Sequence, residues 1–70
     1  MLVLGRKINE SIVLEGKDGK IYIKIVRGKQ ADANNLKIAI EAPKDVKVIR
    51  GEFDPDIEDM EARWAARLGG

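Results

Sequence analysis

The chain has 70 residues and contains no cysteine and no histidine, which excludes disulfides, Ser–His nucleophiles and most zinc sites. A domain of this length buries only about 60% of its unfolded surface, so its own core is marginal. It holds one phenylalanine, one tyrosine and one tryptophan. Association, most often as a two-fold dimer, is therefore the expected way to bury more apolar surface.

The net charge of +1 conceals an uneven distribution. Residues 1–50 carry eleven Lys/Arg and six Asp/Glu, whereas residues 51–70 carry two and six, so +5 and −4 give the total. A basic body favours a polyanionic partner, although mixed charges also simply keep small proteins soluble. No apolar run approaches the ~18 residues of a membrane span and no signal-peptide pattern opens the chain. We expect a cytoplasmic protein with no membrane partner.

Apolar and polar side chains alternate with a period of two through the first fifty residues, which predicts short strands. An Asp18-Gly19 pair favours a tight hairpin between the second and third strands, and the polar segment 28–35 predicts a flexible loop. A proline bend precedes the last strand. Five antiparallel strands with an Ile/Leu/Val face predict a mainly β body, a sheet or small barrel. The expected strands cover residues 2–8, 11–14, 21–27, 36–41 and 46–50.

Beyond the strands the pattern changes to that of a helix over residues 55–68. Asp54 is expected to cap it, with Pro55 at the first position, where a missing N–H costs nothing. The early acidic residues suit the helix dipole. We treat 1–51 as the β body and 52–70 as an acidic amphipathic C-terminal helix of the same domain. Its apolar stripe consists of Ile57, Met60, Trp64 and Leu68.

The residues needed for an enzyme are scarce. Ser11 is the lone serine and has no candidate base other than lysine nearby, and no P-loop or dinucleotide glycine pattern occurs. The acidic cluster of Asp54, Asp56, Glu58 and Asp59 lacks the glycine and spacing of a calcium loop, and helix N-termini attract acids anyway. We expect no catalytic residue, no metal and no cofactor.

Arginines end two of the predicted strand faces. Arg6 shares a side with Leu4, and Arg50 shares a side with Val46 and Val48. Each face combines apolar area with a guanidinium that can fork onto phosphate or stack on a base. An arginine at a strand end is more often simply solvated, so spacing alone leaves both interpretations open. Further attraction to phosphate would come from Lys7, Lys44 and Lys47.

Two stretches favour the nucleic-acid interpretation. MLVLGRKINESI at residues 1–12 and APKDVKVIRGEF at residues 42–53 resemble the two signatures of the carbon storage regulator (CsrA/RsmA) family, bacterial post-transcriptional regulators that bind messenger RNA. The similarity extends to strand order and trailing helix, so it covers nearly all of the chain. The matching residues are Met1, Leu2, Val3, Leu4, Arg6, Lys7 and Glu10, then Ala42, Pro43, Lys44, Asp45, Val46, Val48 and Arg50.

The resemblance implies a strand-exchanged homodimer, in which the first strand of one subunit lies beside the fifth strand of the other. It implies binding to GGA-containing hairpin loops of mRNA, typically near the ribosome-binding site, which represses translation or changes mRNA stability. It further suggests small regulatory RNAs with GGA loops and a protein antagonist as partners. The implied RNA-binding residues are Leu4, Arg6, Lys7, Ala42, Pro43, Lys44, Val46, Val48 and Arg50.

The chain departs from the family pattern in four places. Gly5 stands where a small polar residue is usual, Lys7 where arginine is commoner and Gly51 where an acid is usual, and the 28–35 loop is longer. An alternative function is a protein-interaction or oligomerisation module acting through the helical stripe with weakened RNA binding, although such a stripe more often covers the protein's own sheet. Duplex DNA binding has less support, because the expected helix is acidic.

Overall fold

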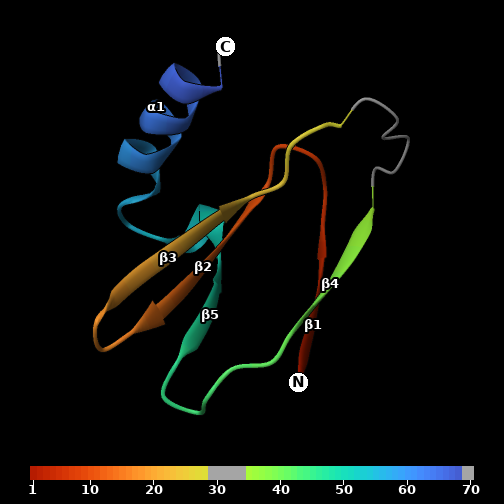
Figure 1. Ribbon diagram of the computed structural model, residues 1–70, viewed down its shortest axis with the longest axis vertical. Helices are drawn as coiled ribbons and strands as arrows, with labels where there is room; N and C mark the ends of the chain where they lie inside the picture. Colours follow the sequence, from red (N-terminus) through yellow and green to blue (C-terminus); the bar gives the residue numbers. More distant parts are fainter. Residues whose placement is uncertain (29–34, 69–70) are drawn as a thin grey trace.

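The computed structural model describes residues 1–28 and 35–68 (Figure 1). The prediction of a mainly β chain with one C-terminal helix is confirmed, whereas most of the expected 28–35 loop lies outside the described residues. The elements in chain order are β1 (Leu2–Arg6), β2 (Ser11–Gly16), β3 (Gly19–Lys24), β4 (Leu36–Ile40), β5 (Lys47–Arg50), the 3-10 helix η1 (Gly51–Phe53) and α1 (Ile57–Arg67).

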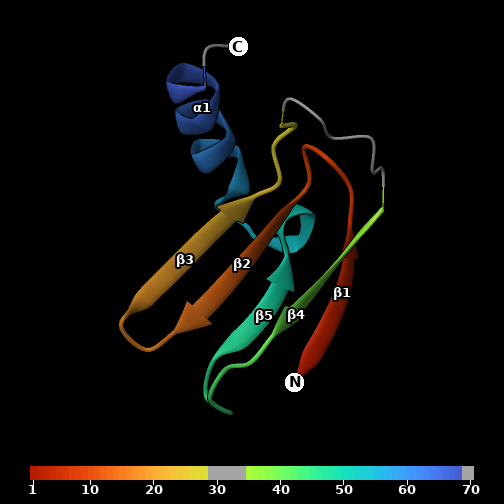
Figure 2. The same cartoon turned by 45° about the vertical axis from the view of Figure 1, so that its right-hand side comes forward.

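The strands of the described chain form two antiparallel sheets, which the sequence had not distinguished. One sheet pairs β1 with β4, with Leu4 opposite Ile38. The other has the order β3-β2-β5, with Ile12 of β2 opposite both Ile23 and Arg50. Figure 2 shows β1 and β4 on the side of the molecule opposite β3. The chain therefore passes from one sheet to the other three times: after β1, between β3 and β4, and between β4 and β5.

The predicted hairpin between β2 and β3 is confirmed, but its turn lies one residue earlier than expected. Gly16 pairs with Gly19, so Lys17 and Asp18 form the two-residue loop. Gly19 has a φ of +134°, a conformation that side-chain-bearing residues rarely adopt. The glycine is needed to start β3 rather than to complete the turn.

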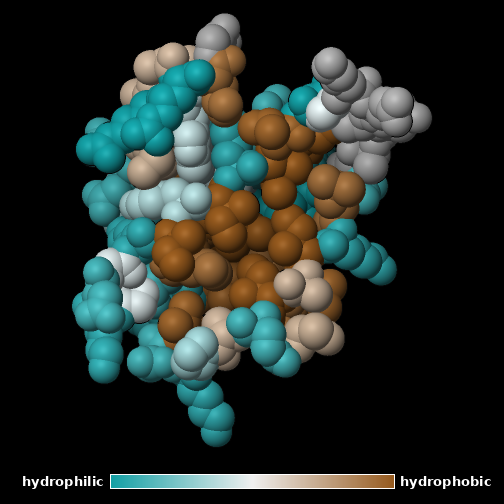
Figure 3. All heavy atoms as spheres, viewed as in Figure 1, coloured by the Kyte–Doolittle hydropathy of each residue, from teal (hydrophilic) through white to brown (hydrophobic). Residues whose placement is uncertain are grey.

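The core is small, as the length of the chain predicts. Its fully enclosed apolar side chains are Leu4, Ile12 and Val13 among the described residues. The chain exposes 5475 Å², whereas a folded monomer of its mass is expected to expose about 4,400 Å². Figure 3 shows apolar side chains gathered across the middle of one face. The fold thus leaves open much of the apolar surface that the alternating pattern supplies.

The helix is shorter than expected and is capped differently. It begins at Ile57, with Asp56 as N-cap and no side-chain capping bond, so the prediction that Asp54 caps it is wrong. Asp54 is instead buried and accepts hydrogen bonds from the ammonium group of Lys20 at 2.8 Å and the hydroxyl of Tyr22 at 3.1 Å. Asp54 therefore joins the segment before α1 to β3.

The middle of the apolar stripe of α1 packs against β3 of the same chain. Trp64 packs edge-on to Tyr22 of β3, with ring centroids 6.3 Å apart and planes 78° apart. No residue of α1 is fully buried, and Leu68 just beyond it is 56% exposed. The helix therefore covers the sheet only lightly.

Gly51 is a glycine because of a close approach between β2 and the end of β5. It is buried, and a Cβ atom on it would overlap the hydroxyl of Ser11 and lie 3.2 Å from the backbone carbonyl carbon of that residue. The acidic residue that similar sequences usually have at the position of Gly51 does not fit this packing.

Replacement of Gly51 by alanine is expected to destabilise the protein by about 1–3 kcal/mol, because the added Cβ overlaps the side chain of Ser11 and lies in tight contact with its backbone. The matched control is Gly5→Ala in β1, where nothing lies within 4 Å of the added Cβ. Urea unfolding of both variants measures the difference. Equal stability of the two variants would contradict the packing around Ser11.

Candidate nucleic-acid interface

The two stretches that carry the family resemblance meet in the folded chain. The start of β1 and the start of β5 line one shallow hollow of about 300 Å³. At the opposite end, Arg6 of β1 bonds Glu52, which follows β5. The two strands therefore run in the same direction, one in each sheet. The residues that line the hollow are Met1, Leu2, Ile40, Ala42, Pro43, Val46 and Val48.

A tight turn sets the position of the residues before β5. The backbone N–H of Val46 donates to the carbonyl of Pro43 at 3.1 Å, which places Lys44 and Asp45 at the tip of a four-residue turn, as the proline bend predicts. Ala42, Pro43 and Lys44 are exposed. The turn thus places an exposed cation, Lys44, next to residues that line the hollow.

The other cations of the candidate site lie where β1 and β5 end. Lys7 directly follows β1 and is exposed, and Arg50 is the exposed last residue of β5. Val46 and Val48, which share its side of the strand, are half-buried. The alternation predicted for this strand is therefore present, with partly accessible valines leading to a solvent-facing guanidinium.

Arg6 differs from the other predicted cations because its side chain is only 6% exposed. Its guanidinium donates to both carboxylate oxygens of Glu52, at 2.8 and 3.3 Å. It also donates to the carbonyl oxygens of Gly5 at 2.9 Å and Ser11 at 3.2 Å. This bidentate pair ties the end of β1 to the start of β2 and to η1.

The charge on this pair is mutually stabilised. Hydrogen bonds from Arg6 lower the pKa of Glu52, and the nearby charge of Arg50 lowers it further. The bond to Glu52 raises the pKa of Arg6. Because the folded pKa of Glu52 is depressed, its contribution to stability is complete above the ordinary carboxyl pKa and is lost as the pH falls through the folded value.

The predicted RNA-binding residues therefore divide into an accessible group and a buried group. In the accessible group, four residues line the hollow and three cations, Lys7, Lys44 and Arg50, are exposed. The buried group consists of Leu4 and Arg6. Direct contact of those two side chains with RNA stays a prediction. Glu52 was missed, since nothing in the sequence pairs it with a residue 46 positions away.

Other kinds of site find little support in the described part of the chain. Within residues 1–28 and 35–68, no three His, Cys, Asp or Glu side chains gather closely enough to hold a metal ion. Over the same ranges, no helix has the length and apolar character needed to cross a bilayer.

The comparisons with known proteins agree with these features. Residues 1–59 match the model of CsrA, the global regulator protein family. This chain belongs to the CsrA family. It is 50% identical over 64 residues to the translational regulator CsrA of Thermosipho africanus (strain TCF52B), with 89% of this chain and 80% of that protein covered. No solved structure gives a significant match.

Further relatives share the same name. The translational regulator CsrA of Brachyspira hyodysenteriae (strain ATCC 49526 / WA1) is 47% identical over 60 residues, covering 86% of this chain and 66% of that protein. That of Alkaliphilus metalliredigens (strain QYMF) is 49% identical over 59 residues, covering 84% and 71%. Membership of this CsrA family implies a role in post-transcriptional regulation.

Glu52→Gln is expected to lower the free energy of unfolding at pH 7 by about 1–3 kcal/mol, because it weakens the acceptor of a buried guanidinium. Glu58→Gln, which removes the same charge from an exposed residue of α1, is the control and is expected to change stability little. Urea unfolding measures both. The difference in free energy of unfolding between the wild type and the Glu52 variant is expected to shrink as the pH falls below the ordinary carboxyl pKa. A difference that does not depend on pH would contradict the assigned ion pair.

Proposed function

We propose that this CsrA-family chain regulates translation by binding GGA-containing hairpin loops of mRNA on the surface formed by β1, β5 and the turn before β5. The observation that carries the proposal is the hollow between apolar residues at the starts of both strands, with exposed cations in the turn and at the strand ends. Loops present unpaired bases whose edges and faces are accessible, which is what sequence-specific RNA readers use.

The role of each residue in RNA binding would follow from its exposure and chemistry. Arg50 would contact base edges or phosphate, because an exposed guanidinium can fork and stack. Val46 and Val48 would provide an apolar floor, with Ala42 and Pro43 at its rim. Lys7 and Lys44 would attract the RNA backbone. Leu4 and Arg6 are buried in the single chain and would support the site from below. Strand exchange that exposed their side chains would bring them into contact with RNA.

Homodimerisation by strand exchange belongs to the same proposal. The pairings of β1 with β4 and of β2 with β5 connect strands of one chain, and the same registers could form between two chains. The exposed area exceeds that of a typical monomer of this size by about 1,000 Å², close to the roughly 800 Å² that each partner buries in a standard interface. The open apolar face supports such a partner (Figure 3).

A dimer would carry two equivalent RNA sites. Binding of one loop would raise the effective concentration of a second loop on the same transcript, so paired GGA loops would bind more tightly than single ones. Occupation of a loop near the ribosome-binding site would repress translation or change mRNA stability. Small regulatory RNAs with GGA loops would compete through the same chemistry.

Arg50→Ala is expected to weaken binding of a GGA hairpin by ~1–3 kcal/mol through loss of a specific contact, with the dimer still folded. Arg63→Ala removes the same charge from α1, which contributes no residue to the proposed site, and is expected to have a smaller effect. Gel-shift titrations at one fixed salt concentration compare the two, since salt alone changes RNA affinity. Unchanged affinity for the Arg50 variant would remove this residue from the site.

Light scattering coupled to size exclusion is expected to give the mass of two 7.8 kDa chains. The physical reason is the apolar surface that one chain leaves open. A monomer at micromolar concentration would contradict the dimer, while leaving the location of the RNA surface to the Arg50 experiment.

A further inference from the structure

The outer side of β3 has a pattern that the proposed GGA site does not use. Lys20, Tyr22 and Lys24 alternate along this strand, so their side chains lie on one side, about 6.7 Å from one to the next. Surfaces that bind single-stranded nucleic acid combine cations that attract the backbone with aromatic rings on which bases stack. This row has both chemistries on a rigid strand.

Acidic residues next to α1 occupy the first part of this row. The ammonium group of Lys20 bonds Asp54 at 2.8 Å and Asp56 at 3.0 Å. The hydroxyl of Tyr22 donates to the other carboxylate oxygen of Asp54 at 3.1 Å. Two carboxylates therefore sit where a polyanion would meet this end of β3.

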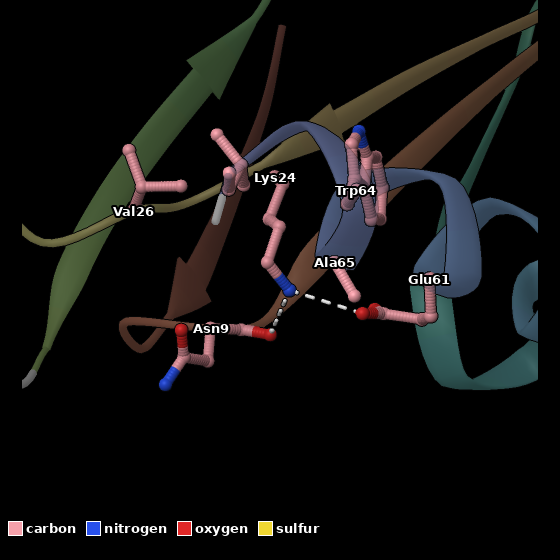
Figure 4. A pocket seen from close by; sticks show the side chains of 7 residues that line it. Asn9, Lys24, Val26, Glu61, Trp64 and Ala65 are labelled. Carbon is pink, nitrogen blue, oxygen red and sulfur yellow. Dashed lines mark hydrogen bonds and ion pairs between the residues drawn. The ribbon is translucent and has the colours of Figure 1, made fainter. Parts of the chain in front are cut away.

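The helix itself occupies the rest of the row. The ammonium group of Lys24 bonds Glu61 at 3.0 Å and lies 5.2 Å from the ring centroid of Trp64, whose ring also packs edge-on to Tyr22. Figure 4 shows Lys24 between the helix and the backbone carbonyl of Asn9, which it approaches at 3.4 Å. An aromatic ring and a carboxylate thus contact the same lysine.

The covering of β3 is light and largely ionic. No residue of α1 is fully buried, and the side chain of Glu61 is 42% exposed. A hollow of about 330 Å³ remains beside Lys24 and Trp64. The carboxylates of Asp56 and Glu61 are exposed, and ion pairs with exposed partners contribute little and are screened by salt. The helix α1 can therefore leave Lys24 and Tyr22 while the buried Asp54 keeps its bond to Lys20.

We propose that the outer side of β3 is a second binding surface for single-stranded RNA, which α1 occupies in the free protein. The exposed carboxylates of Asp56 and Glu61 take the places of phosphates, and Trp64 takes the place of a stacked base. The inference rests on the proposed RNA-binding role and extends it to the unpaired strand beside a GGA loop. Such RNA must displace α1, which lowers affinity for isolated strands.

The test compares Glu61→Gln with Glu58→Gln, because both remove one negative charge from α1 but only Glu61 bonds Lys24. A U-rich strand without GGA, about ten nucleotides long, is the probe. The Glu61 variant is expected to bind it about two- to fivefold more tightly than the wild type, and the Glu58 variant is not. Adding Lys24→Gln to the Glu61 variant should remove the gain.

Trp64 is the single tryptophan, so its emission reports the position of α1 directly. RNA binding to β3 should shift this emission toward that of a solvent-exposed indole. Equal gains for both glutamate variants, or binding of the U-rich strand with unchanged emission, would overturn the inference. Titration of the same variants with a GGA hairpin separates it from the proposed function, which depends on Arg50 and not on Lys24.

Discussion

The bidentate pair between Arg6 and Glu52 is the contact on which the arrangement of the candidate site depends. A buried guanidinium is tolerated only when its donors are satisfied, and here a carboxylate and two backbone carbonyls accept from it. The pair joins β1 of one sheet to the residue that follows β5 of the other. Lys7 directly follows Arg6, and Arg50 lies two residues before Glu52, so the pair holds these two exposed cations at the same end of the molecule. Arg6, itself predicted to contact RNA, thus also helps to position Lys7 and Arg50.

The second constraint is the shortage of enclosed apolar surface. Two small sheets with Leu4, Ile12 and Val13 at their centre leave an open apolar face, so the fold and its association are coupled. This coupling has a functional consequence in the proposed dimer, since the elements that would be exchanged, β1 and β5, are the elements that carry the RNA surface. Stability, oligomeric state and the integrity of the site would then respond together to changes at their ends.

Much of the fold was predictable because it follows from local periodicity. Period-two alternation located four of the strands, a short apolar run located β2, and the change to a helical stripe located α1. The signature around Pro43 supplied four of the residues that line the hollow, Ala42, Pro43, Val46 and Val48. Met1, Leu2 and Ile40 also line it and were not among the predicted site residues. Contacts between distant residues were not: Arg6 with Glu52, and Lys20 with Asp54, depend on how the sheets and tail meet. Asp54 was assigned to a cap because local rules cannot include a lysine 34 positions away. Gly51 likewise has its reason in Ser11.

In the proposed function, RNA binds where β1, β5 and the turn between Pro43 and Val46 meet. Backbone amide chemical shifts, recorded during titration of the full chain with a GGA hairpin, test this location without any substitution. The largest changes are expected at the end of β1 near Lys7 and from Ala42 to Arg50. Changes concentrated on the β2–β3 turn around Lys17, or spread evenly over all lysines and arginines, would contradict it.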